Sequence, residues 1–334
     1  MKKLIAVAVL GALAAPAFAD SGNVTISGNL RAGVQFLNKA ASAPRDFNGD
    51  GDFLDPGEAR DAKQTQIDGR GQIQFNMSED LGNGLTAVGQ IRSRFAIDGS
   101  GRDEGDTKRD GTFGNHNTWV GLKGSFGQVR LGRGEDNFGD GKHDNLELYG
   151  DVLHGRISST SNMVRYDLPA MGGFSGSLQW STGEDKATGH KATTGTVLRV
   201  DYDAANWDVG AAYEKVSLQG GSIKNWEITG GVKFGDWALG LEHEQVKASG
   251  ISNKIKSTTL YAGASFGKID FQGQYGRQKV SGVSGKTTTY SLGLNYNLSK
   301  RTKFFTEYMS IKTDIGGISA DRASKFFVGL KHSF

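Results

Sequence analysis

Seven arginines lie in or beside segments in which apolar and polar residues alternate, and guanidinium groups in such places attract anions. They are Arg31, Arg70, Arg92, Arg94, Arg130, Arg133 and Arg165. The first five share the polar side of their segments, Arg133 ends the fifth segment, and Arg165 lies in the sixth. Because successive side chains of a strand point to opposite faces, fixed positive charges are expected along one face. Such charges beside water predict electrostatic selection of ions.

The stretch after Arg133 shows no alternation and is rich in acidic residues. These acids are Glu135, Asp136, Asp140, Asp144, Glu147 and Asp151, and the basic residues among them are Lys142, His143, His154 and Arg156. Carboxylates opposed to arginines would create an electric field across the gap between them, and rings of charge set ion preference. Seven arginines against six acids leave the sign of that preference open, with a slight lean toward anions.

One acidic segment resembles the start of a calcium-binding loop. The candidate ligands are Asp46, Asn48, Asp50, Asp52 and Glu58. The twelfth position of such a loop should be a bidentate Glu, but it is Gly57, and Glu58 comes one residue late. The favoured interpretation is therefore an acidic surface loop without metal, and calcium binding is the alternative.

No catalytic arrangement stands out. Gly263, Ser265 and Gly267 fit the spacing G-x-S-x-G, but a nucleophile elbow needs a strand followed by a helix, and here another alternating segment follows. The six histidines show no metal-binding spacing. The sequence therefore predicts neither a cofactor nor enzymatic activity, and a membrane-embedded protease or phospholipase is the alternative.

The alternating segments recur about every 20 residues from Val24 to Phe334, and sixteen strands are expected. Short turns alternate with longer polar loops between them. The expected loops include 217–224 and 281–286, and the expected strands include 226–234, 258–266 and 269–280. The last segment, 326–334, places Phe326, Val328 and Leu330 on one face and ends the sequence on Phe334. A strand that ends there is expected to pair with the first strand and to close a barrel.

The start of the sequence and its composition agree with an exported β protein. Residues 1–19 have a positive start, an apolar core and an A-x-A site before Asp20, which predicts a signal peptide cleaved after Sec-dependent export and a single domain over 20–334. The chain has 39 basic residues, of which Lys2 and Lys3 precede the cleavage site, and 36 acidic ones. This balance argues against nucleic-acid binding. With 50 Gly, 4 Pro and no Cys, the composition suits paired strands.

The predicted fold class is all-β, a 16-stranded antiparallel transmembrane β-barrel with short periplasmic turns and long extracellular loops. Sixteen long amphipathic strands have more apolar face than one soluble core needs, so a soluble sandwich or propeller is the weaker alternative. In lipid every backbone polar group must be paired, which requires a closed barrel, and one of about 16 strands leaves an aqueous channel. Aromatic residues near strand ends are expected to form girdles, namely Trp119, Trp180, Trp207, Trp226, Trp237 and Phe334.

Several stretches carry a resemblance to a known family. They are residues 119–133 (WVGLKGSFGQVRLGR), 164–169 (VRYDLP), 173–177 (GFSGS), 297–302 (NLSKRT) and 329–334 (GLKHSF). Over essentially the whole mature chain the sequence resembles the general porins of β-proteobacterial and neisserial type. The resemblance implies a homotrimer in the Gram-negative outer membrane, surrounded by lipid and lipopolysaccharide. It also implies a third loop folded into the lumen and a terminal Phe334 read by the barrel-assembly machinery.

The expected function is that of a general diffusion porin for ions and small hydrophilic solutes. By the resemblance, the acidic loop after Arg133 narrows the lumen and faces the arginines. Two alternatives belong to other classes. One is a substrate-selective, anion-preferring channel with a binding site at the constriction, and the other is a surface barrel with a blocked lumen that serves in adhesion.

Overall fold

Strands make up most of the part of the chain that the computed structural model describes. The described residues are 23–38, 63–97, 113–134, 142–150, 153, 162–183, 186, 188–189, 191–319 and 322–334. Among these residues, no helix has the length and apolar character needed to cross a membrane.

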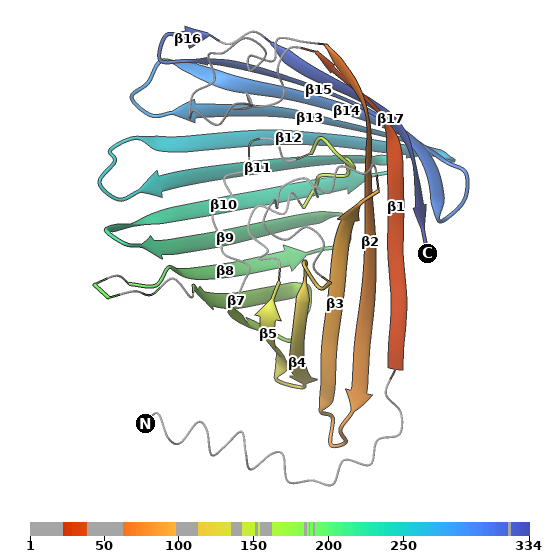
Figure 1. Ribbon diagram of the computed structural model, residues 1–334, viewed down its shortest axis with the longest axis vertical. Helices are drawn as coiled ribbons and strands as arrows, with labels where there is room; N and C mark the ends of the chain where they lie inside the picture. The colour runs from red at the N-terminus through yellow and green to blue at the C-terminus, as the bar shows by residue number, and fades with distance from the viewer. Residues whose placement is uncertain are drawn as a thin grey trace.

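Seventeen strands form one sheet in this part of the chain (Figure 1). The first eight are β1 (Asn23–Asn38), β2 (Gln64–Asp80), β3 (Thr86–Ala96), β4 (Thr118–Gly124), β5 (Gly127–Arg133), β6 (Met163–Asp167), β7 (Phe174–Thr182) and β8 (Thr194–Asp203). The others are β9 (Trp207–Leu218), β10 (Gly221–Phe234), β11 (Trp237–Ala248), β12 (Lys254–Phe266), β13 (Ile269–Val280), β14 (Gly285–Asn297), β15 (Thr302–Ile315), β16 (Ile318–Ser319) and β17 (Ala323–Ser333). Because the two-residue β16 only extends the β15 hairpin, sixteen of these strands form the wall, as predicted.

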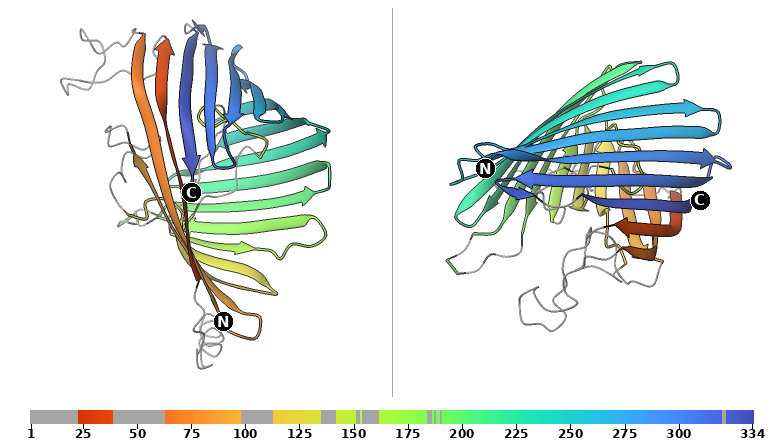
Figure 2. Two further views of the ribbon diagram at one scale, coloured as in Figure 1. Left: turned by 90° about the vertical axis from the view of Figure 1, so that its right-hand side faces the viewer. Right: turned by 90° about the horizontal axis from the view of Figure 1, so that it is seen from above.

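The sheet closes on itself through β17. Each strand from β1 to β15 pairs antiparallel with the next, and β17 pairs with both β15 and β1. Figure 2 shows the two ends of the sheet meeting, with red β1 beside blue β17. The closure continues to the last residue, since the N–H of Phe334 donates to the carbonyl oxygen of Gly28 and the N–H of Gly28 donates back, each at 3.0 Å. Closure removes the two free edges that an open sheet would have.

Deleting Phe334 is expected to lower the amount of folded barrel in the outer membrane several-fold while leaving export intact. The deletion removes both hydrogen bonds to Gly28 and the ring that lies over that glycine, where a Cβ would sit 2.5 Å from the ring. Heat-modifiable migration of membrane fractions on gels would measure folded protein, with Phe334→Tyr as the control that keeps an aromatic ring. Wild-type levels of folded protein after the deletion would contradict the prediction.

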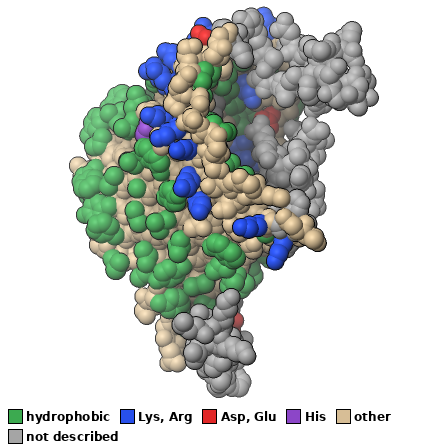
Figure 3. Space-filling view, turned by 90° about the vertical axis from the view of Figure 1, so that its left-hand side faces the viewer, with side chains coloured by type: hydrophobic (Ala, Val, Ile, Leu, Met, Phe, Trp, Pro, Cys, Tyr) green, Lys and Arg blue, Asp and Glu red, His purple; other side chains and the backbone are tan. Residues whose placement is uncertain are grey.

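The two faces of the sheet have opposite character. On β1, Val24 and Ile26 point outward and are 62% and 59% exposed, whereas the inward Gln35 is 2% exposed. On the other strands, too, apolar side chains are exposed on the outer face and polar side chains are buried on the inner face. Figure 3 shows apolar side chains covering the outer face. An exposed apolar face around a polar interior suits a lipid surround rather than water.

The connections at one rim are shorter than predicted. The polar stretches 217–224 and 281–286 were expected to be loops, but β9 and β10 continue to Leu218 and Gly221, and β14 begins at Gly285. These ends carry polar residues on both faces, so the alternation that marks a strand is missing from the sequence although the backbone pairing continues.

The aromatic girdle is confirmed for most of its members but not for Trp119. Trp180, Trp207 and Trp237 point outward and are about half exposed. Trp119 instead faces the lumen, because it pairs with the inward Gln90 on β3. The prediction was wrong at this position because it rested on nearness to a strand end, whereas Val120 and Leu122 point outward and alternation therefore places Trp119 on the inner face.

Candidate constriction of the lumen

Strand register gathers six of the seven predicted arginines on the inner face of one part of the wall, β1 to β6. Arg31 on β1 lies opposite Arg70 on β2, and Arg130 on β5 lies opposite Arg165 on β6. We call these residues, with one further arginine, the arginine wall; it consists of Arg31, Arg70, Arg92, Arg94, Arg130, Arg165 and Arg199.

Amide side chains on β2 orient two members of the arginine wall on β3. The Nε of Arg92 donates to the Oε1 of Gln74 at 2.6 Å, and the Nε of Arg94 donates to the Oε1 of Gln72 at 3.1 Å. Each glutamine is the direct cross-strand partner of its arginine. Neutral amide groups thus fix the direction of the two guanidinium groups.

Asp167 on β6 holds two further members of the arginine wall. Its Oδ2 lies 2.5 Å from Nη2 of Arg130, and its Oδ1 accepts a hydrogen bond of 2.8 Å from Nε of Arg165. The Arg130 guanidinium also lies 5.1 Å from the ring centroid of Trp119. One carboxylate between two arginines leaves this pair with a net positive charge.

Arg133 does not belong to the arginine wall. It lies opposite Thr118 and on the same face as Leu131, which points away from the lumen. Its Nη1 donates to the carbonyl oxygen of Asn115 at 3.0 Å. Arg133 is three residues from Arg130, an odd separation, so the two side chains of β5 leave on opposite faces.

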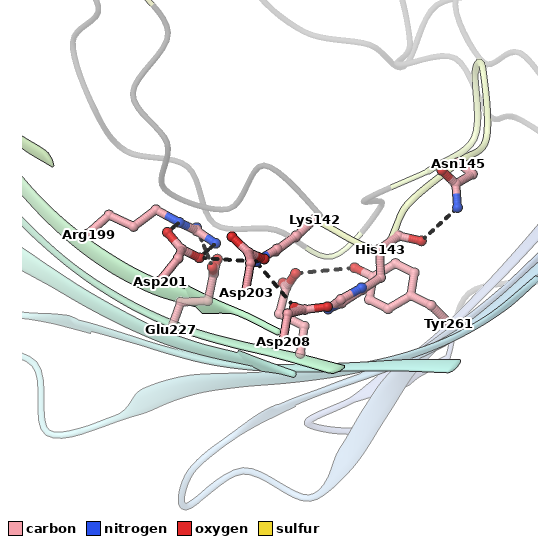
Figure 4. A network of polar contacts seen from close by, with 10 residues as sticks. Lys142, His143, Asn145, Arg199, Asp201, Asp203, Asp208, Glu227 and Tyr261 are labelled. Atoms are coloured by element: carbon pink, nitrogen blue, oxygen red, sulfur yellow. Dashed lines mark hydrogen bonds and ion pairs between the residues drawn. The ribbon is translucent and has the colours of Figure 1, made fainter. Parts of the chain in front are cut away.

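Arg199 on β8 completes the arginine wall and was missed by the sequence reasoning. It makes a bidentate pair with Asp201, at 2.8 and 2.9 Å, and reaches Oε1 of Glu227 on β10 at 3.1 Å (Figure 4). The signal was present, because Arg199 stands between Leu198 and Val200, both of which point outward.

The loop between β5 and β6 runs inside the barrel along the opposite part of the wall, at least over residues 142–150. Glu307, an inward residue of β15, accepts backbone hydrogen bonds from Glu147, Leu148 and Tyr149 at 2.5, 2.9 and 3.1 Å. A carboxylate that receives three N–H donors fixes this segment firmly to the wall.

Tyr149 anchors the end of the same segment. Its side chain is buried in a cluster with Phe305, Met309 and Phe327. Its hydroxyl accepts a hydrogen bond of 2.9 Å from Gln35, and its carbonyl oxygen accepts one of 2.7 Å from Ser291. Burial of an aromatic ring together with satisfied polar atoms makes this contact a second attachment point for the loop.

Glu147 was predicted as a loop acid that faces the arginines, and the structure places its carboxylate between two lysines instead. Lys303 on β15 and Lys331 on β17 each lie 2.7 Å from it. Arg31 donates to the carbonyl oxygen of Glu147, not to the carboxylate. Burial disfavours the charged form, but Lys331 and Lys303 outweigh it and hold the pKa of Glu147 below its ordinary value.

Lys142 and His143 attach the other end of the described loop segment to β8 and β9 (Figure 4). The Nζ of Lys142 lies 2.6 Å from Asp203 and 3.3 Å from Asp208, and Nε2 of His143 lies 3.3 Å from Oδ1 of Asp208. Burial is the main reason why the pKa of His143 lies below its ordinary value, and Asp208 opposes the shift. The imidazole is therefore neutral at pH 7.

Asp144 is also turned toward the wall behind the loop, where it accepts a hydrogen bond from Gln274. The other predicted loop acids, Glu135, Asp136, Asp140 and Asp151, lie outside the described residues, as do residues 1–19 and the calcium candidates Asp46, Asn48, Asp50, Asp52 and Glu58. In the part of the chain that the structure describes, no group of three His, Cys, Asp or Glu residues could hold a metal ion.

Buried acids line the wall that faces the arginines. Glu214 on β9, Glu227 on β10, and Glu242 and Glu244 on β11 point inward and are at most 3% exposed. They were missed although each has the polar parity of its strand. The inward arginines named above thus lie on β1–β8, where Asp167 and Asp201 pair with three of them, and these four buried glutamates lie on β9–β11.

Acid is expected to loosen the attachment of the loop segment in two steps. The pKa of His143 is lowered when the loop is attached to the wall. The attachment therefore weakens as the pH falls below 6.5, the ordinary pKa of histidine. The lowered pKa of Glu147 stabilises the attached loop above pH 4.5, and this contribution is lost as the pH falls further. We expect steady single-channel current near pH 7, more frequent closures near pH 5 and still more near pH 4. His143→Gln should abolish only the first step, and an unchanged pH profile would contradict this assignment.

A closed barrel with an apolar outer face, a charged inner face and a loop attached within the lumen is a membrane channel. The chain belongs to the Gram-negative porin family, which matches residues 6–316. It is similar over its full length, and over the full length of each relative, to two proteins of Neisseria meningitidis. It is 28% identical to the major outer membrane protein P.IA of serogroup A and 26% identical to P.IB of serogroup B.

Two solved structures have a similar fold. The anion-selective porin from Comamonas acidovorans matches with a TM-score of 0.73 and 21% identity, over 94% of this chain and 100% of that one. A loop L8 deletion mutant of OmpT from Vibrio cholerae matches with a TM-score of 0.68 and 18% identity, over the same shares. Family and fold together confirm the predicted function: this protein is a diffusion porin of the Gram-negative outer membrane.

Proposed function

We propose that the channel passes ions and small hydrophilic solutes passively and prefers anions. The observation that carries the proposal is the arginine wall, whose seven members lie on six of the eight neighbouring strands β1–β8. The charge of Glu147 is balanced by Lys303 and Lys331, so this loop acid adds no net negative charge to the passage. The similar fold of a porin described as anion-selective favours the same direction.

Reversal potentials test the preference. A planar bilayer that contains the full-length protein would separate two KCl solutions of tenfold different concentration. We expect the sign that corresponds to chloride entering more readily than potassium. Strong cation preference would overturn the proposal.

A second candidate function is a solute-binding channel, and the arrangement of Arg130 and Arg165 around Asp167, with Trp119 beneath, favours it. An anionic solute bound there would interrupt the current in a saturable way. Titrating phosphate or citrate against single-channel current separates the candidates: saturable block indicates a binding site, and linear dependence indicates free diffusion. A protein without any conductance would instead fit the surface barrel with a blocked lumen.

We infer further that the protein forms a homotrimer and acts without a cofactor or catalytic step. The assembly is supported by family membership and by one fold relative, OmpT of Vibrio cholerae, which was solved in a trimer form. Insertion by the barrel-assembly machinery and contact with lipopolysaccharide belong to the same proposal. Light scattering of the detergent complex tests the trimer, and titration calorimetry with calcium is expected to give no heat.

A further inference from the structure

Four aromatic side chains of the described strands point into the lumen, namely Trp119, Tyr261, Phe305 and Phe327. The loop segment covers three of them, because the ring of His143 lies 6.1 Å from that of Tyr261 and Tyr149 packs against the two phenylalanines. These three are at most 4% exposed, whereas Trp119 is half-buried. Among the four, the indole of Trp119 is therefore the aromatic surface that a solute in the lumen can touch.

Glycines leave room beside this indole. Trp119 lies directly opposite Gly132 on β5, and the next residue of β4 on the same face is Gly121. A Cβ at Gly132 would lie 3.2 Å from the Cβ of Trp119, so any side chain there would press on the tryptophan. On β3 the partner of Trp119 is Gln90, whose Nε2 donates to the carbonyl oxygen of Asn117 at 3.3 Å. The neighbouring positions on β4 and β5 thus leave space for a solute next to the ring.

Arg130 supplies a positive charge at the same place. Its guanidinium lies 5.1 Å from the ring centroid of Trp119, which is a cation–π contact. The Nε and Nη2 of Arg130 both donate to Oδ2 of Asp167, at 2.9 and 2.5 Å. A guanidinium has five N–H donors, so these two bonds leave three, of which two are on Nη1. The side chain of Arg130 is 22% exposed, and a solute in the lumen can therefore reach it.

The surroundings of Arg130 and Trp119 favour a negatively charged ligand. Asp167 is shared with Arg165, whose Nε donates to its Oδ1 at 2.8 Å. Arg92 follows two residues after the β3 partner of Trp119, so a third guanidinium belongs to the same part of the wall. Carboxylates form charge-assisted hydrogen bonds with guanidinium groups, and planar rings stack on an indole. A carboxylate attached to an aromatic ring can use both kinds of contact at once.

We propose that Trp119 and Arg130 form a binding subsite in the lumen for planar aromatic carboxylates. The carboxylate accepts hydrogen bonds from Nη1 of Arg130, and the ring of the solute stacks against the indole in the space beside Gly121 and Gly132. This inference rests on the proposed anion preference and deepens it, because it names the class of anion that the channel binds most strongly.

The subsite distinguishes anions of equal charge. An aliphatic carboxylate of the same size can bind Arg130 but gains no stacking contact with the indole, and an aromatic contact is worth a factor of about 2 to 10 in affinity. A neutral aromatic solute can stack, but it lacks the charge-assisted hydrogen bond, which is worth roughly a further factor of ten. Only a solute with both features gains both contributions.

Block of the single-channel current in a planar bilayer tests the subsite. The probes are benzoate and cyclohexanecarboxylate, which have the same charge at pH 7 and similar size, although only benzoate is planar and aromatic. On the wild-type protein we expect saturable block by benzoate, at a half-blocking concentration about fivefold below that of cyclohexanecarboxylate. Benzyl alcohol, which has the ring without the charge, should need roughly ten times more than benzoate.

Three variants without any change of charge locate the effect. Trp119→Leu should make the half-blocking concentrations of the two acids equal, and Trp119→Phe, which keeps an aromatic ring, should retain most of the difference. The control is Trp237→Leu on the outer face of β11, where the tryptophan is half exposed, and it should behave as wild type. All three should keep the wild-type reversal potential in KCl, and open-channel conductance reports that the barrel is intact.

The comparison of the two acids on the wild-type channel needs no variant to fold. Absence of saturable block by benzoate, equal block by the two acids, or a difference that survives in Trp119→Leu would overturn the subsite and leave the anion preference standing. A reversal potential that shows cation preference would instead overturn the proposed function, because that measurement contains no aromatic solute.

Discussion

Replacing Arg92 and Arg94 together by glutamine is expected to lower the chloride-over-potassium permeability ratio about tenfold in 0.1 M salt. A chloride ion that passes within about 4 Å of a fixed positive charge in water gains about 1 kcal/mol, so removing two such charges costs at most about 2 kcal/mol, or roughly 30-fold. Screening in 0.1 M salt, where the Debye length is about 10 Å, lowers this to about tenfold. The glutamines that orient these two guanidinium groups, Gln74 and Gln72, are neutral, so the substitution leaves neither of them as an unpaired charge. The effect on the permeability ratio should shrink in 1 M salt, where the Debye length is only about 3 Å.

The matched control removes the same charge from the other face of the barrel. Arg277 and Lys279 are exposed on the outer face of β13, and replacing both by glutamine should leave the reversal potential unchanged. If the two double variants shift it equally, surface charge rather than the arginine wall determines selectivity. If neither shifts it, the arginines of β3 do not face the ion path.

Glu307→Ala is expected to release the loop segment from the wall and to cause the largest structural change of any single substitution considered. The carboxylate accepts three backbone hydrogen bonds, and each buried N–H left without an acceptor costs about 1–3 kcal/mol. A total above about 3 kcal/mol changes the ratio of attached to detached loop more than 100-fold. Single-channel recordings should show large current fluctuations, and a protease should cut the loop at least ten times faster.

The control for this substitution lies on the same strand. Asp314→Asn removes an acid from the outer face of β15 and should leave both current noise and cleavage at wild-type levels. Glu307→Gln keeps one acceptor oxygen and should give an intermediate result. Wild-type cleavage of the Glu307→Ala protein would mean that Tyr149 and the lysine contacts of Glu147 suffice to hold the loop.

Strand boundaries show how far alternation carries a prediction. The predicted strand 269–280 coincides with β13, because apolar and polar residues alternate along most of its length. The predicted starts at Trp226 and Thr258 fall short of β10 and β12, which begin at Gly221 and Lys254. Near the rim, beyond the apolar residues of the outer face, both faces of a strand contact water or lipid head groups. The sequence there no longer distinguishes a strand from a loop.

The sequence by itself determined which side chains of the long strands face inward. Alternation within a strand can be recognised without knowing which strands pair with it. It correctly placed five arginines in the lumen, namely Arg31, Arg70, Arg92, Arg94 and Arg130. It also predicted closure at Phe334, because a barrel in lipid has no other way to pair its first and last strands.

Only the tertiary structure decided which charges meet. Lys331 is 184 residues from Glu147, and the two are brought together by the closure of the barrel and the inward path of the loop. Likewise Arg199 meets Glu227 across two neighbouring hairpins. Ion pairs depend on the height of each residue along tilted strands and on the route of the loop, and neither quantity is encoded in the local pattern of residues.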